Sequence, residues 1–123
     1  MSHTLPLTLL GVTALLGMTL AAGVLREVGN PAWLRRAHLL AGGSALLALL
    51  RAVRDAAAAT PPLPGSNGHL PAVLVACAFL LGLTVWLSAR YAQQGLTIVR
   101  ALHVCVGFCA VILAAAWILR PGA

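Results

Sequence analysis

Two histidines within apolar stretches are the residues of this chain that are best suited to chemistry. His38 lies in the stretch RRAHLLAGG, and His103 lies in the stretch RALHVCVGF. A polar side chain in hydrocarbon is costly unless a partner satisfies it, so an intramembrane histidine indicates a functional site. Whether the two imidazoles form one site depends on the helices that position them.

The two stretches belong to an internal repeat with an offset of 65 residues, from His38 to His103. The pairs that this shift aligns are Arg35 with Arg100, His38 with His103, Gly42 with Gly107 and Gly17 with Gly82. Matches between leucine-rich segments arise easily by chance, whereas matched arginines, histidines and glycines do not. The sequence therefore predicts a duplicated helix hairpin whose two copies are related by an axis along the membrane normal.

Four apolar segments carry these residues, and each is close to the ~20 residues needed to cross a bilayer. We expect helices over about residues 5–25, 31–53, 71–90 and 96–119, with Asn30 capping the second helix and Pro31 at its first position. Only 8% of the residues are charged and the mean hydropathy is +0.98, whereas soluble domains contain about 25% charged residues. The sequence thus predicts an all-α integral membrane four-helix bundle, with residues 1–123 as a single domain.

The charged residues limit the possible classes of function. The net charge is +6, but the basic residues are arginines near the ends of apolar segments, which is typical of topology signals and not of a nucleic-acid interface. More of these arginines lie around the first and third connections, so we expect those connections in the cytoplasm and both termini outside it, in a prokaryotic inner or plasma membrane. The acidic residues Glu27 and Asp55 lie in different loops, which excludes a catalytic carboxylate pair. We therefore expect no catalytic residues.

The predicted helices place the two histidines at one depth in the membrane. The second and fourth helices run in the same direction, and each histidine lies seven residues past its predicted helix start, roughly 10 Å along the helix. Two imidazoles that face each other across a bundle suit axial ligation of one heme b, in which each Nε2 binds the iron. Gly42 and Gly107 follow the histidines by four positions, and Gly17 and Gly82 fall in the same layer. We expect these four glycines to leave room for the porphyrin.

Three arginines are candidates for binding the propionates of the cofactor. Arg35 and Arg100 precede the histidines by three positions, which places them on roughly the same helix face and one turn nearer water. Bidentate pairing of guanidinium with carboxylate would neutralise the propionates, and Arg36 is a further donor. The alternative for the arginines is a boundary charge that extends to the headgroups, and the alternative for the glycines is close helix packing.

Other roles for the histidines stay open at the level of sequence. Tetrahedral zinc needs two further ligands, and Cys105 points away from the face of His103, two positions earlier. For Cys77, Cys105 and Cys109 the simplest interpretation is packing. Each histidine could instead ligate a chlorophyll magnesium, or hydrogen-bond to a neighbouring helix in a cofactor-free accessory or assembly subunit.

Electron transfer is the function that a pair of axial histidines favours. With both axial positions filled by protein, iron has no free position for a substrate. The chain also has little mass outside the membrane with which to recognise a soluble redox partner. We therefore expect a heme-bearing subunit of a larger membrane redox complex, in contact with other membrane subunits and lipid, that passes electrons toward quinone or another cofactor.

The chain resembles the small four-helix b-type membrane cytochromes, and it is similar to one four-helix half of heme A synthase. The architecture carries the resemblance over most of the chain, and the specific part is RRAHLLAGG and RALHVCVGF. The resemblance implies that His38 and His103 are axial heme ligands. The chain has no glutamate before His38 in its helix, where the synthase places a catalytic acid, and it contains one bundle. The resemblance therefore implies heme binding alone.

Overall fold

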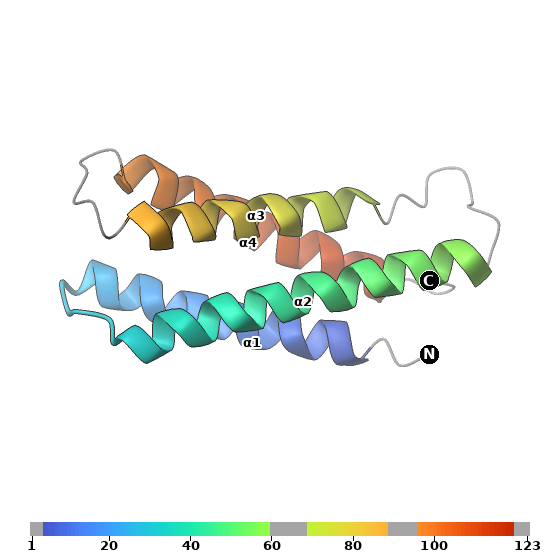
Figure 1. Cartoon of the computed structure of the whole chain (residues 1–123), viewed down its shortest axis with the longest axis horizontal. Helices are drawn as coiled ribbons and strands as arrows, with labels where there is room; N and C mark the ends of the chain where they lie inside the picture. Colours follow the sequence, from blue (N-terminus) through green and yellow to red (C-terminus); the bar gives the residue numbers. More distant parts are fainter. Residues whose placement is uncertain (1–3, 60–68, 89–95, 120–123) are drawn as a thin grey trace.

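The computed structural model describes residues 4–59, 69–88 and 96–119, and these residues form four helices (Figure 1). The helices are α1 (Thr4–Leu25), α2 (Ala32–Ala59), α3 (His69–Ser88) and α4 (Leu96–Ile118). Each helix is long and apolar enough to cross a membrane. The predictions of an all-helical fold and of four helices with membrane-spanning length are therefore confirmed for the described residues.

The bounds of α2 differ most from the expected ones. We expected this helix to end near residue 53, but it continues to Ala59 and is 28 residues long. The added residues include the run DAAAA, and alanine has the highest helix propensity of all residues. The helix therefore continues past the point where the hydropathy of the segment falls. The expected end of the third helix at residue 90 lies outside the described residues.

The connection between α1 and α2 is a Schellman motif. The amide of Val28 donates to the carbonyl of Gly23 (3.0 Å), and the amide of Glu27 donates to the carbonyl of Val24 (3.2 Å). Glu27 occupies the left-handed position of this motif, with φ of 55°, where glycine is the usual residue. The chain therefore leaves α1 through a fixed turn and not through a loose loop.

Asn30 does not cap α2, contrary to our expectation. Its side-chain amide donates to the carbonyl of Leu20 in α1 (2.8 Å), so Asn30 ties the connection to the preceding helix. The carbonyl of Pro31 accepts from the amides of Leu34 and Arg35, which places Pro31 one position before the first residue of α2. The sequence prediction was therefore wrong about the role of Asn30 and one residue early for Pro31.

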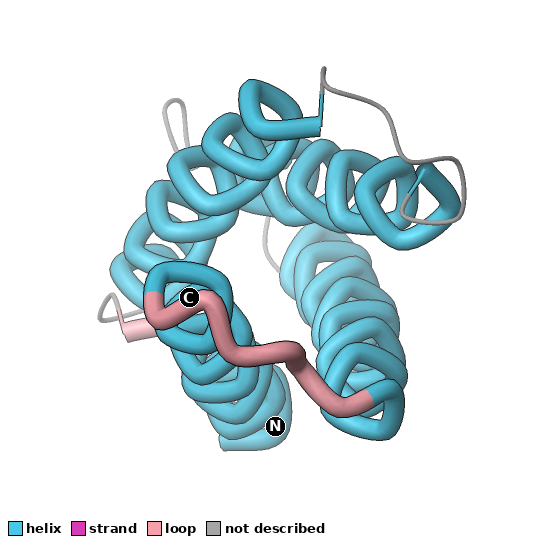
Figure 2. Tube along the Cα trace, turned by 90° about the vertical axis from the view of Figure 1, so that its left-hand side faces the viewer, coloured by secondary structure: helices cyan, strands magenta, loops and turns pink. Residues whose placement is uncertain are grey.

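The four helices form a ring in which each helix packs mainly against two neighbours (Figure 2). The most extensive contacts lie within the hairpins α1–α2 and α3–α4, and the hairpins meet through α2–α3 and α1–α4. α2 and α4 are therefore diagonal to each other across the bundle. This arrangement is the one expected for two copies of a hairpin around a central axis.

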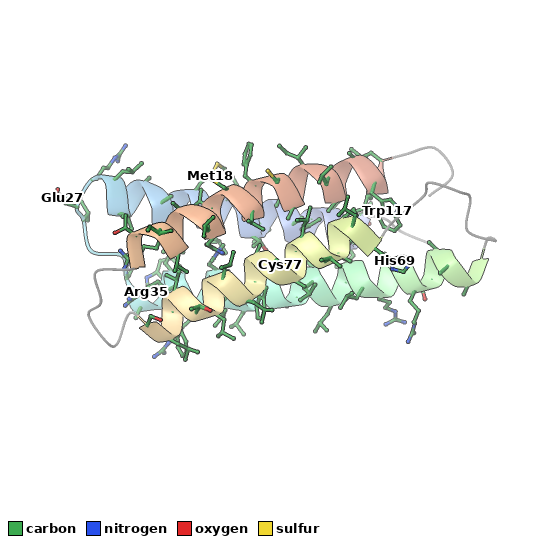
Figure 3. The ribbon with its side chains drawn as sticks, turned by 90° about the horizontal axis from the view of Figure 1, so that it is seen from above. Met18, Glu27, Arg35, His69, Cys77 and Trp117 are labelled. Carbon is green, nitrogen blue, oxygen red and sulfur yellow. The ribbon has the colours of Figure 1, made fainter. Side chains whose placement is uncertain are left out.

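The buried core lies at one end of the bundle. It is formed by the first part of α1 and α3 and by the last part of α2 and α4, and its residues are Leu10, Ala45, Leu49, Val53, Ala72, Val75, Ala110, Ala114, Trp117 and Ile118. Figure 3 shows Trp117 and His69 toward this end, and Glu27 and Arg35 toward the other end. Among the described residues near that other end, one hydrophobic side chain is buried, that of Leu34. Tight apolar packing therefore closes one end of the bundle and not the end that holds the predicted arginines.

Candidate functional site

His38 and His103 meet across the bundle. His38 is on α2 and His103 is on α4, and their ring centroids are 6.0 Å apart with the ring planes at 82°. Both side chains are half-buried. Because α2 and α4 are diagonal, the imidazoles reach toward the central axis from opposite sides. The structure thus brings together the two residues that the sequence analysis selected as metal ligands.

Each imidazole is held by a backbone carbonyl of the preceding helix. His38 Nδ1 lies 3.1 Å from the carbonyl oxygen of Thr13 in α1, and His103 Nδ1 lies 2.8 Å from that of Ala78 in α3. A carbonyl oxygen can only accept, so Nδ1 of a neutral ring must carry the proton in both contacts. The proton on Nδ1 leaves the lone pair of each Nε2 free for a further partner.

The two carbonyl contacts are equivalent under the repeat. Each joins a histidine to the residue 25 positions before it, and the same 65-residue shift that aligns the histidines aligns Thr13 with Ala78. Sequence reasoning missed these partners. The acceptor is a backbone carbonyl, which every residue type has, so the identity of the residue does not reveal it.

Gly17 and Gly82 make room for the histidine rings. A Cβ atom at Gly17 would lie 3.0 Å from Cε1 of His38, and one at Gly82 would lie 2.7 Å from Cε1 of His103. We expected these glycines to leave space for a porphyrin, but in this structure the imidazoles occupy that space. The two glycines therefore position the candidate ligands directly.

Gly42 and Gly107 have looser surroundings. A Cβ atom at Gly42 would be in ordinary contact with Thr13 (3.6 Å) and Phe79 (3.7 Å), and one at Gly107 would lie 3.9 Å from the Cβ of Ala78. Both glycines therefore face the neighbouring helices at the level of the carbonyl contacts. The ring of Phe79, which sequence reasoning did not single out, fills the space beside Gly42 and Gly43.

The predicted arginines lie toward the open end of the bundle and are exposed. Arg35 and Arg36 are the fourth and fifth residues of α2, and Arg100 is the fifth residue of α4. Figure 3 shows Arg35 at the same end of the molecule as Glu27. Their guanidinium groups are thus available to an anion at the end of the bundle that the apolar core leaves open.

His38 and His103 are the nearest pair of potential metal ligands in this layer of the described residues. Within the described residues, no group of three or more His, Cys, Asp or Glu side chains could share a metal ion. The two imidazole rings lie with their centroids 6.0 Å apart and their planes at 82°. Cys77, Cys105 and Cys109 are free and exposed. The residues present therefore offer one pair of imidazoles whose Nε2 atoms could serve a metal that takes two nitrogen ligands.

Comparisons of the chain with models of protein families, with curated proteins and with solved structures find no match.

Proposed function

We propose that this protein binds one heme b through His38 and His103 and serves as an electron-transfer subunit of a larger membrane redox complex. One observation carries the proposal. Both Nδ1 atoms are held by carbonyls in equivalent positions of the two hairpins, and the rings lie 6.0 Å apart. Orientation of a ligating imidazole by a hydrogen bond from its other nitrogen is a general property of metal-binding histidines.

The residues of the chain would each have a defined task toward the cofactor. His38 and His103 would supply the two axial nitrogens, and the carbonyls of Thr13 and Ala78 would hold those rings in the ligating tautomer. Arg35 and Arg100, with Arg36 as a further donor, would pair with the propionates at the open end of the bundle. When bound, heme b supplies reversible one-electron chemistry at iron, and two protein ligands leave no axial position for a substrate.

The shape of the described residues supports the proposal of a larger complex. The described residues lie almost entirely in four helices of membrane-spanning length, so they provide little surface outside the membrane for a soluble redox partner. The partners that this shape favours are other membrane subunits and a membrane-soluble carrier such as quinone. The open end of the bundle, where Arg35 lies, is the side at which the cofactor edge would be nearest to water.

A cofactor-free accessory subunit is the second candidate, and one observation favours it. Both Nδ1 atoms already have hydrogen-bond partners, and the two rings contact each other edge to face. In that case the histidines would fix the two hairpins relative to each other. A subunit of this kind would bind no pigment.

The absorption spectrum and the pyridine hemochrome of the purified membrane protein decide between these candidates. We expect a six-coordinate low-spin spectrum with a sharp reduced α band when the protein is expressed with ample heme. His38→Ala and His103→Ala should each abolish or convert this spectrum, because each removes one axial ligand. His69→Ala is the matched control, since His69 is exposed at the opposite end of the bundle.

A colourless wild-type protein would overturn the heme proposal and favour the accessory subunit. Loss of the spectrum in His69→Ala to the same extent as in the other two variants would show that the histidine pair is not the ligand set. Extraction of the pigment identifies chlorophyll, in case the histidines bind magnesium instead of iron.

A further inference from the structure

The outer face of α2 near its carboxyl end combines two exposed leucines with two exposed arginines. Leu47, Leu50, Arg51 and Arg54 line a surface groove with a volume of about 390 Å³. Their spacing of three, one and three residues places them on one side of the helix. Leu49 and Val53 lie on the opposite side, buried in the core, so the packing of α2 fixes the direction in which the groove faces.

The length of α2 places this groove at the boundary between hydrocarbon and headgroups. Its 28 residues extend about 42 Å, whereas the hydrocarbon core of a bilayer is about 30 Å thick. With Arg35 near one boundary, Arg51 lies about 24 Å and Arg54 about 28 Å farther along the helix, so Arg54 is close to the opposite boundary and Arg51 is one turn inside it. Leu47 and Leu50 then remain at the depth of the acyl chains, and Arg51 and Arg54 reach the depth of the phosphates.

We propose that this groove, formed by Leu47, Leu50, Arg51 and Arg54, is a binding site for one anionic phospholipid. The two guanidinium groups would pair with the phosphate and donate hydrogen bonds to oxygens of the headgroup, and the two leucines would contact the first part of an acyl chain. Asp55, the nearby acid, is half-buried while both arginines are exposed, so the face presents net positive charge to the membrane. Basic side chains beside exposed apolar ones at this depth are the features by which proteins select anionic lipids.

Native mass spectrometry of the full chain, released from detergent with phosphatidylglycerol and phosphatidylcholine at equal concentration, tests the proposal. We expect the wild-type protein to retain one phosphatidylglycerol in preference to phosphatidylcholine. Arg51→Gln and Arg54→Gln should each lower this preference about fivefold, and the double variant should lower it about 25-fold. Arg26→Gln is the matched control, because Arg26 is an exposed arginine at the other end of the bundle and lies outside the groove.

Three results would overturn the proposal. Equal retention of the two lipids by the wild-type protein would show that the groove does not select an anionic headgroup. An equal loss in Arg26→Gln would show a general effect of net charge. Displacement of phosphatidylglycerol by a moderate excess of glycerol phosphate would show that phosphate alone is bound and that the leucines contribute nothing.

Discussion

The layer that contains His38, His103 and their neighbouring glycines, here called the histidine layer, should lose stability by different amounts when single methyl groups are added to the glycines. Gly82→Ala would place a Cβ atom 2.7 Å from Cε1 of His103, which is closer than real Cβ contacts occur. The ring cannot move freely, because its Nδ1 is held 2.8 Å from the carbonyl oxygen of Ala78. Restoring an ordinary contact needs a displacement of about 0.7 Å, so the substitution must shift either the imidazole or α3 against α4.

The magnitude of this effect follows from the cost of overpacking. An inserted methylene in a packed site costs about 1–3 kcal/mol, and replacing glycine by alanine within a helix returns up to about 1 kcal/mol. We therefore expect Gly82→Ala to destabilise the protein by about 1–2 kcal/mol. Gly17→Ala, with a contact of 3.0 Å, should cost less, and Gly107→Ala, with a contact of 3.9 Å, should be neutral or stabilising.

Two assays test the series on the same preparations. Unfolding in mixed micelles measures the loss of stability, and the low-spin fraction of the heme spectrum measures the displacement of the axial ligand. Gly107→Ala is the matched control, because it adds the same methyl group to the hairpin that contains Gly82. Equal stability and equal spectra for Gly82→Ala and Gly107→Ala would refute the claim that the glycine positions the imidazole.

Three further predictions concern the arginines, the turn after α1 and the core. Replacing Arg35 or Arg100 with Leu should retain the low-spin spectrum and lower the midpoint potential of the heme by tens of millivolts. The reason is that losing a nearby cation stabilises ferric iron, and 1.4 kcal/mol corresponds to about 59 mV for one electron. Unchanged potentials in both variants would exclude pairing with propionates. Glu27→Gly should stabilise the protein by about 1 kcal/mol in unfolding experiments, because Glu27 has a positive φ of 55°, and a loss of stability would contradict this account of the turn. Leu49→Ala, at a fully buried position of the core, should destabilise the protein by about 2–5 kcal/mol and leave the heme spectrum unchanged. A changed spectrum would show that the core is coupled to the layer that contains His38 and His103.

The sequence could predict the helices and the common depth of the histidines for physical reasons. Four apolar segments of sufficient length specify membrane-spanning helices, because backbone polar groups in lipid must be satisfied within the segment. A repeat offset that preserves helix direction also preserves depth, so His38 and His103 had to lie in one layer if the repeat was real. The structure places their ring centroids 6.0 Å apart.

The details of the site depended on properties that side-chain types do not reveal. The acceptors for the histidines are backbone carbonyls, and the residues that bear them, Thr13 and Ala78, share no chemistry. Gly17 and Gly82 could be selected by their spacing, but the sequence could not predict that imidazole rings fill the space beside them. The extension of α2 to Ala59 reflects the helix propensity of alanine, whereas the expected end near residue 53 rested on hydropathy.

Under the proposed function, the position of the core at one end of the bundle would separate folding from heme binding. A chain that is stabilised at its closed end can insert, form both hairpins and pair them before any cofactor arrives. The main apolar contacts lie away from His38 and His103, so binding of the proposed heme would leave those contacts in place. The same separation would let the residues around His38 and His103 change during evolution while the core at the other end continues to hold the four helices together.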